Sequence, residues 1–340
     1  MHSRWMLRCF LPLHAVIAVL GFAAPSNAGT VCDPKGPWRQ ELLLEGYAQD
    51  VEAVAWSPDG SQVAAGANDG ALALFDSRTG EELLTFSTRA RVIASVAWSP
   101  DGAQLASGAG GGSANTYEIW DTASGERIRE LTELVGWGFS IAWSPDGSVI
   151  LGSNGGGQIN LWDNDTGALL RSLRSTQFTD YVWSVAWSPD GSQFLGGGGP
   201  WDHYGKVWDA ELGTVTYVLA HGEIVYWVAW SPEGSQVATA SGDHTAKTWD
   251  PSSGELIFEL EHDASVLSVA WSPDAALLAT GAFDGRVRIW SADSGELQAT
   301  IVGSGGSAYS VGWSPEGDRL AFGSGTSVEI WTRCAESAVR

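Results

Sequence analysis

Short apolar segments separated by Pro, Asp and Gly recur along most of the chain. One unit runs from an apolar segment at residues 46–56, through a Ser-Pro-Asp-Gly turn at residues 57–60, to two further apolar segments at residues 62–66 and 71–76. Segments this short, with turn residues between them, are typical of strands in a small antiparallel sheet. The pattern therefore predicts that each unit is one such sheet.

The unit occurs seven times. Its first strand ends each time in Trp-Ser-Pro-Asp or Trp-Ser-Pro-Glu, with the tryptophan at Trp56, Trp98, Trp143, Trp187, Trp230, Trp271 and Trp313. Successive copies are 41 to 45 residues apart, a spacing that fits four-stranded propeller blades rather than helical or leucine-rich repeats. In the first six copies a further strand, such as residues 255–260, follows the third. The sequence thus predicts an all-β, seven-bladed β-propeller of four-stranded antiparallel blades.

The Ser-Pro-Asp-Gly turn has a local physical explanation. Proline presets φ at the second turn position, and glycine accepts the left-handed conformation that lets the next strand pair back. In the sixth copy Ala275 replaces that glycine. If the position is left-handed there, we expect a strain of about 1 kcal/mol.

The last copy needs an outer strand from elsewhere. It ends at its third strand, residues 328–332, whereas residues 39–45 have the outer-strand pattern and precede the first copy. An open propeller would leave unpaired strand edges. We therefore expect residues 39–45 to complete the seventh blade and close the ring.

The third strand of each unit ends in a second aromatic residue, at Phe75, Trp120, Trp162, Trp208, Trp249, Trp290 and Trp331. Because both aromatic positions, the turn and the spacing recur together, the chain resembles the WD40-repeat family over essentially all of the mature sequence. The resemblance implies a hydrogen-bonded His, Ser/Thr, Asp and Trp in each blade. Carried over by spacing, only blades five and six hold both the His and the Asp, as His221, Asp243 and Trp249 and as His262, Asp284 and Trp290.

The other blades depart from the pattern of the family. Their His position is occupied by Tyr47, Arg89, Leu134, Phe178 and Ser304, although Asp69 and Asp202 fill the Asp position in blades one and four. The chain therefore resembles a degenerate member. We expect blades two, three and seven to depend more on apolar packing.

Residues 1–28 have the pattern of a secretory signal: a basic start, a mostly apolar stretch at residues 11–24 and a small-residue cleavage site, Ser-Asn-Ala, at residues 26–28. A membrane anchor is the alternative, but the stretch contains Pro12 and His14 and is short for a span of about 20 residues. The sequence favours export from a bacterial-type cell, to the periplasm or the exterior. The expected organisation is completed by a lead-in at 29–38, the propeller at 39–333 and a tail at 334–340.

The net charge of the chain limits the classes of partner that it can bind. The chain has 40 Asp and Glu against 18 Lys and Arg, a net charge of −22, and loss of Arg4 and Arg8 with the signal would make it −24. The electric field of so negative a chain repels polyphosphate backbones, so we expect no nucleic-acid partner.

Cleavage of the signal would also leave two cysteines, Cys32 and Cys334, beside the predicted ring closure. In an exported protein this pair is a disulfide candidate.

Candidate chemistry is sparse, and we expect no catalytic residue, metal or cofactor. His203 and His244 follow positions of the blade network in neighbouring blades, but no ligand spacing typical of a metal site appears. No glycine-rich run between a strand and a helix suits phosphate. The segment that starts at Asp163 resembles a calcium loop, but Arg174 stands where the distal carboxylate is needed.

Aromatic residues give the better candidate site. In WD40 propellers the positions four and six before the first tryptophan, and the one before the network Asp, commonly face the channel mouth. Carried over by spacing, these positions predict a binding site of Trp137, Phe139, Tyr181, Trp183, Trp201, Tyr226, Phe283 and Tyr309, with Asp50 and Glu52 at its rim. Exposed aromatic rings bury a large area at low entropic cost on binding. The alternative is that the rings fill the channel against one another.

The function favoured by these observations is a non-enzymatic scaffold, a monomer, that binds a protein or peptide. A basic or amphipathic partner fits the charge best. One alternative is a binding module for glycans or small molecules that uses the same aromatic residues. Another is a hydrolase or lyase in which His203, His244 and nearby carboxylates converge.

Overall fold

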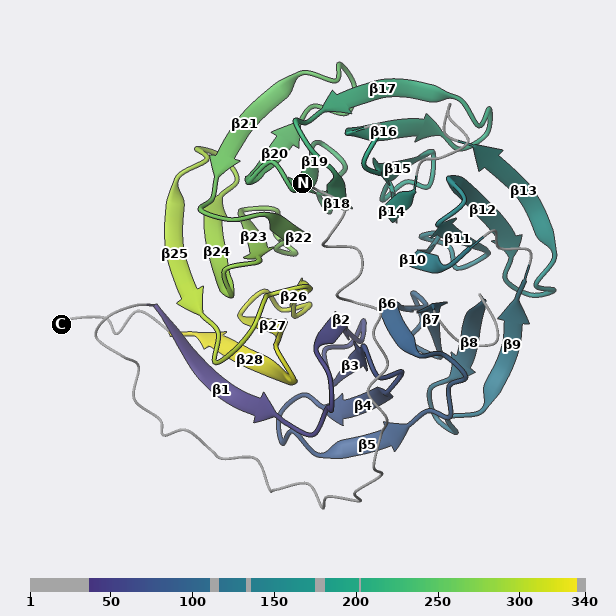
Figure 1. Ribbon diagram of the computed structural model, residues 1–340, viewed down its shortest axis with the longest axis vertical. Helices are drawn as coiled ribbons and strands as arrows, with labels where there is room; N and C mark the ends of the chain where they lie inside the picture. Colours follow the sequence, from purple (N-terminus) through teal and green to yellow (C-terminus); the bar gives the residue numbers. More distant parts are fainter. Residues whose placement is uncertain (1–36, 111–115, 133–135, 175–180, 202, 335–340) are drawn as a thin grey trace.

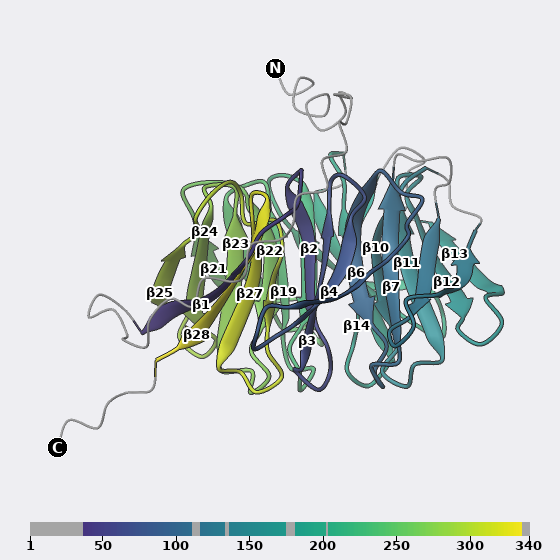
Figure 2. The ribbon, with the colours of Figure 1, turned by 90° about the horizontal axis from the view of Figure 1, so that it is seen from below.

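A computed structural model describes residues 37–110, 116–132, 136–174, 181–201 and 203–334. The strands of these residues form seven four-stranded antiparallel sheets, arranged as blades around a central axis (Figure 1). The prediction of an all-β, seven-bladed propeller is confirmed. Figure 2 shows the disc edge-on, with strands running between its two faces.

The strands are grouped by their distance from the axis. The innermost strands are β2 (Val51–Trp56), β6 (Val92–Trp98), β10 (Gly138–Trp143), β14 (Val182–Trp187), β18 (Val225–Trp230), β22 (Val266–Trp271) and β26 (Val311–Trp313). The second strands are β3 (Gln62–Ala67), β7 (Gln104–Gly110), β11 (Val149–Asn154), β15 (Gln193–Gly198), β19 (Val237–Ser241), β23 (Leu277–Ala282) and β27 (Arg319–Ser324). The third strands are β4 (Leu72–Asp76), β8 (Tyr117–Asp121), β12 (Gln158–Asp163), β16 (Tyr204–Asp209), β20 (Thr245–Trp249), β24 (Arg286–Ser291) and β28 (Ser327–Arg333). The outer strands are β5 (Glu82–Thr85), β9 (Arg127–Leu131), β13 (Leu169–Arg174), β17 (Val215–Ala220), β21 (Leu256–Glu261), β25 (Leu297–Val302) and β1 (Trp38–Leu44).

The ring is closed by β1. It pairs antiparallel with β28, so the seventh blade has the strand order β1-β28-β27-β26. The predicted closing strand is confirmed, one residue earlier than expected. Beyond the strands, the backbone N–H of Cys334 donates to the carbonyl of Pro37 over 2.7 Å, which holds the two ends of the propeller together.

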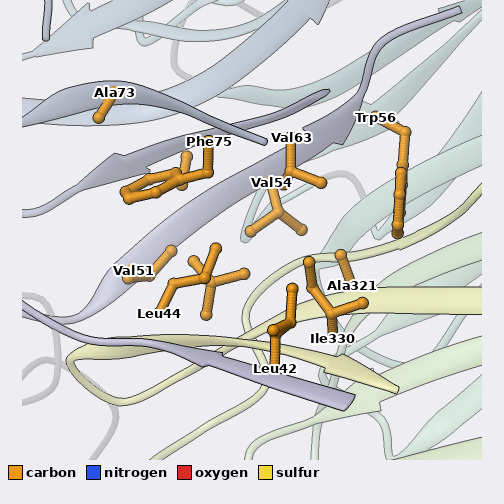
Figure 3. Close-up of a cluster of buried hydrophobic side chains, with 12 residues drawn as sticks. Leu42, Leu44, Val51, Val54, Trp56, Val63, Ala73, Phe75, Ala321 and Ile330 are labelled. Carbon is orange, nitrogen blue, oxygen red and sulfur yellow. The ribbon is translucent and has the colours of Figure 1, made fainter. Parts of the chain in front are cut away.

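The apolar core lies between neighbouring blades. At the junction of blades seven and one, Leu42 of β1 and Ile330 of β28 pack with Val54 and Phe75 of blade one (Figure 3). Next to it, the ring of Trp38 meets the ring of Trp313 edge-on at 5.7 Å. Burying these side chains between blades stabilises the closed ring, because each blade alone would leave an apolar face in water.

Hydrogen bonds near the axis also join neighbouring blades. In four blades the indole N–H of the first tryptophan donates over 3.1 Å to a carbonyl of the preceding blade, as Trp56 does to Gly312. At four junctions a serine hydroxyl accepts from a backbone N–H of the next blade, as Ser310 does from Val54. The repeated tryptophan therefore connects blades as well as filling its own.

The Ser-Pro-Asp-Gly turns have the expected geometry. The N–H of Gly60 donates to the carbonyl of Ser57 over 2.9 Å, with φ of Gly60 at +71°. In the sixth blade Ala275 takes the same place, with its N–H bonded to the carbonyl of Ser272 and φ at +57°. The condition for the expected strain, a left-handed backbone at this alanine, is therefore met.

Ala275→Gly should stabilise the protein by about 1 kcal/mol, because glycine adopts positive φ without the clash of a Cβ atom. The midpoint of urea unfolding would measure the change. Gly102→Ala is the matched reverse control, since Gly102 has φ of +72° at the same turn position and an added Cβ would make only ordinary contacts with Pro58. An unchanged or lowered midpoint for Ala275→Gly would contradict the account.

Several expectations fall on residues outside the described ranges. These are the signal at 1–28, nearly all of the lead-in at 29–38, Asp202, Cys32 and all but the first residue of the tail. In the part of the chain that the structure describes, no helix has the length and apolar character needed to cross a membrane.

The Cys32–Cys334 disulfide stays a prediction, supported by the bond between Pro37 and Cys334. We expect intact mass analysis and thiol labelling of the mature protein to find both thiols blocked until a reductant is added. Cys334→Ser should then lower the free energy of unfolding by about 2–4 kcal/mol, because the bond would close nearly the whole chain. Free labelling of both cysteines in the exported protein would disprove the bond.

Candidate binding surface

One face of the disc, called here the loop face, is where the innermost strands begin. It is formed by the connections that enter each blade and by the turns between second and third strands. Backbone bonds join these two sets, as between Asn68 and Asp50, Gly155 and Trp137, and Gly242 and Ile224, each at 2.9 Å. The Ser-Pro-Asp turns lie on the opposite face, called here the turn face.

A β-bulge occurs near the start of the innermost strand in six blades. The register shifts at the fourth position before the first tryptophan, at Glu52, Ala94, Phe139, Trp183, Tyr226 and Leu267. A bulged residue has no partner in the ladder, and the local kink redirects its side chain. One of the three sets of positions carried over from the family, the fourth before the first tryptophan, thus coincides in six blades with the residue that the backbone releases from the ladder.

Four aromatic rings from three blades form one contiguous group, called here the aromatic cluster: Phe139, Tyr181, Trp183 and Tyr226. Phe139 and Trp183 lie 4.5 Å apart between ring centroids, and Trp183 and Tyr226 lie 5.9 Å apart edge-on. Tyr181 contacts Phe139 at 5.9 Å and Trp183 at 6.1 Å. All four are partly buried, so the rings pack on one another and still expose some of their surface.

Glycines lie beneath these rings. The residue twelve positions after the first tryptophan is glycine in blades two, three, four, five and seven. A Cβ atom would come within 3.0 Å of the Trp137 ring at Gly110, 3.4 Å of Phe139 at Gly155 and 3.4 Å of Tyr226 at Gly242. The absence of a side chain at these positions lets the large rings lie close to the backbone.

The remaining aromatic candidates are distributed more widely over the loop face. Trp137 is partly buried over Gly110 of the neighbouring blade. Trp201 is 74% exposed in blade four, Phe283 is 47% exposed in blade six, and Tyr309 is partly buried in blade seven. The described ring contacts therefore join four of the eight predicted aromatic residues.

Glu52 occupies the bulge of blade one. Its carboxylate accepts a hydrogen bond from the side-chain amide of Asn68. Burial raises the pKa of Glu52 to about 7; the bond from Asn68 opposes this, and the charge of Asp50 raises the pKa further. This carboxyl group therefore changes charge near neutral pH.

The hydrogen-bond network is complete in blade five. His221 Nδ1 donates to Asp243 over 2.9 Å, and its Nε2 lies 2.7 Å from the hydroxyl of Thr239, which accepts from the indole N–H of Trp249 over 2.9 Å. Burial lowers the pKa of His221 despite the opposing influence of Asp243. The ring is thereby held in its neutral form, as a structural group.

Blade six differs at the aspartate. His262 lies 2.8 Å from Thr280, which accepts from Trp290, but its Nδ1 bonds to the carbonyl of Leu260. The Asp284 carboxylate instead accepts from Arg288 over 3.0 Å and from Arg286 over 3.2 Å. The prediction that Asp284 binds His262 is therefore wrong. A permanently charged guanidinium makes stronger hydrogen bonds to a carboxylate than a neutral imidazole does.

His203 and His244 lie in left-handed turn conformations, with φ of +52° and +70°. The Nε2 of His203 donates to the carbonyl of Pro200 over 2.6 Å. Among the residues that the structure describes, no group of three or more His, Cys, Asp or Glu side chains could hold a metal ion. These histidines thus have turn roles, and their geometry offers no support for the enzymatic alternative.

Comparison with known families gives two matches. A family model described as the IFT122 first beta-propeller matches residues 137–340, more than half of the chain. The chain belongs to this propeller family. A second model, described as the anaphase-promoting complex subunit 4 WD40 domain, matches residues 42–101, in agreement with a WD40 propeller. No curated protein matches the sequence.

Some elements of this WD40 propeller were not foreseen. In blade seven, Glu329 accepts from the indole N–H of Trp331 over 2.7 Å and from the backbone N–H of Ser304, in place of the His-based network. Glu223 also lies beside the aromatic cluster, next to Tyr226 at Gly242. The recurring glycine twelve residues after the tryptophan was the available signal for that contact.

Glu52→Gln should change how the stability of the propeller depends on pH. The folded-state pKa of Glu52 lies above its ordinary value of 4.5. The contribution of a carboxyl group with a raised pKa is fully present below about pH 4.5 and is lost as the pH rises through about 7. Relative to Glu52→Gln, the wild type should therefore lose on the order of 1–2 kcal/mol between about pH 5 and about pH 8.

Urea unfolding at the two pH values would measure this difference. Glu45→Gln, at an exposed site just before blade one, is the control for loss of one carboxylate. Equal pH dependence of the wild type and Glu52→Gln would show that Glu52 ionises normally.

Proposed function

We propose that the chain is a non-enzymatic scaffold that binds a protein or peptide outside the cytoplasm through the loop face of blades three to five. The observation that carries the proposal is the contact of four aromatic rings across three blades, three of them at the bulged starts of inner strands. WD40 propellers generally bind protein partners. The aromatic cluster is the feature that supports the loop face as the place of binding.

The physical basis is the way that aromatic side chains bind. A partly exposed ring held by its neighbours has already lost most of its conformational freedom, so little entropy remains to be lost on binding. Tryptophan and tyrosine are also enriched among the residues that dominate interface energies. Trp183 contacts the other three rings and lies at the centre of the cluster.

The net charge and the pattern of the first 28 residues support the proposed partner and compartment. A chain with net charge −22 attracts a basic or amphipathic partner at long range. The pattern of residues 1–28 supports export to the periplasm or the exterior, and we propose that the mature protein acts there as a monomer.

Glycan binding is a second candidate, favoured by Trp201. Its side chain is 74% exposed in blade four. An open indole face is a stacking surface for a sugar ring as well as for a peptide. A glycan array probed with the wild type and with Trp201→Ala would separate the two: a sugar signal that depends on Trp201 would favour the glycan reading.

Trp183→Ala and Tyr226→Ala should each weaken partner binding about 30-fold or more, the effect of removing a residue worth at least 2 kcal/mol at an interface. The partner would be captured from an extract of the native compartment, identified, purified and titrated against each variant by calorimetry. Leu212→Ala is the matched control, because Leu212 is 70% exposed after the third strand of blade four, on the turn face.

We expect thermal midpoints within a few degrees of the wild type for all three variants. Undiminished binding by Trp183→Ala would contradict the site. A fall of the midpoint by much more than about 5 °C would instead identify the ring as part of the core.

A further inference from the structure

Glu223 and Tyr226 both border Gly242 at one edge of the aromatic cluster. A Cβ atom at Gly242 would lie 3.4 Å from the Cβ of Glu223 and 3.4 Å from the ring of Tyr226. The other side of Tyr226 faces Trp183, with ring centroids 5.9 Å apart. The blade-five edge of the cluster therefore has the start of an acidic side chain and an aromatic ring beside a position without a side chain, with a second ring, that of Trp183, next to them.

This combination suits a positive charge. The face of an aromatic ring is electrostatically negative and attracts an ammonium or guanidinium group within about 6 Å, most strongly for tryptophan. A neighbouring carboxylate adds a direct charge–charge attraction and can accept hydrogen bonds from the same cation. An apolar ligand would gain from the rings but would leave the carboxylate desolvated beside it, which is costly.

The protein itself contains the same type of contact elsewhere. On the turn face the guanidinium of Arg319 lies 4.7 Å over the ring of Trp56 and donates to the carbonyl of Ser77 over 2.9 Å. In that contact, ring stacking and hydrogen bonding by one arginine join blades seven and one. It shows that a tryptophan next to an acceptor binds a cation in this scaffold.

We propose that Trp183, Tyr226 and Glu223 bind an arginine or lysine side chain of the partner. The inference rests on the proposed function, since it names the group that the aromatic cluster recognises. The cation lies against the two rings and donates to the Glu223 carboxylate. The charge of the chain, −22, raises the local concentration of basic peptides and so speeds encounter, whereas the three residues give the site its selectivity.

The test uses two labelled peptides, hexa-arginine and hexa-citrulline, with the mature protein. Citrulline keeps the shape of arginine but has no charge. At low ionic strength, fluorescence polarisation should show at least tenfold tighter binding of hexa-arginine. Glu223→Gln and Tyr226→Leu should each weaken hexa-arginine binding about tenfold.

Glu81→Gln is the matched control for non-specific attraction. It removes the same charge from an exposed position in the turn before β5, on the opposite face, and should leave hexa-arginine binding unchanged within about twofold. Equal effects of Glu223→Gln and Glu81→Gln would overturn the proposal, because only bulk charge would then matter. Equal binding of hexa-citrulline would overturn it as well. Glu223 is partly exposed, so its variant tests the site even if a ring substitution unfolds the protein.

The outcomes also separate this inference from the proposed function. If Trp183→Ala weakens binding of the captured partner but hexa-arginine binds no better than hexa-citrulline, the scaffold role is supported and the cation site is disproved. If Trp183→Ala weakens binding of neither the partner nor hexa-arginine, both the scaffold role and the cation site are disproved.

Discussion

Pairing of β1 with β28 is the constraint on which the rest of the structure depends. The seventh blade has only three strands of its own, and its outer strand comes from the other end of the chain. Each blade buries its apolar surface against its neighbours, so an open ring would expose two such surfaces as well as two strand edges. The junction core of Leu42, Val54 and Ile330 forms only when the circle is complete. The loop face, which carries the aromatic cluster, is one face of this closed ring.

The sequence was sufficient for the fold because the fold repeats. Seven copies of one turn, each 41 to 45 residues after the last, determine the number of blades, and a strand missing at one end and present at the other determines the closure. The conformation of the turns could also be predicted from the sequence, since Ala275 adopts the positive φ that its place in the motif implies. These features depend on short segments whose conformational preferences do not need distant contacts.

The candidate site could be predicted from the sequence only in part. Counting back from each tryptophan located Phe139, Trp183 and Tyr226, but the bulge that releases them from the sheet is a property of backbone pairing and has no residue signature. In blade six the Asp284 carboxylate accepts a hydrogen bond from Arg288 and not from His262. Sequence spacing alone does not predict which of two competing donors a carboxylate binds. Glu223 was missed because it lies outside the repeat positions, and its place beside the turn at Gly242 is a feature of the folded blade.

The bulges have a further consequence for how such a propeller diversifies. A residue outside the ladder can be exchanged without disturbing the strand register, the turn or the interblade bonds, so different residue types are compatible with the same blade. In this chain the six bulges hold an acid, an alanine, a leucine and three different aromatic residues within otherwise similar blades. The ring therefore combines a uniform set of strands and turns with a small set of variable bulge residues. Substitution of the bulge residues alone can therefore change what the propeller binds.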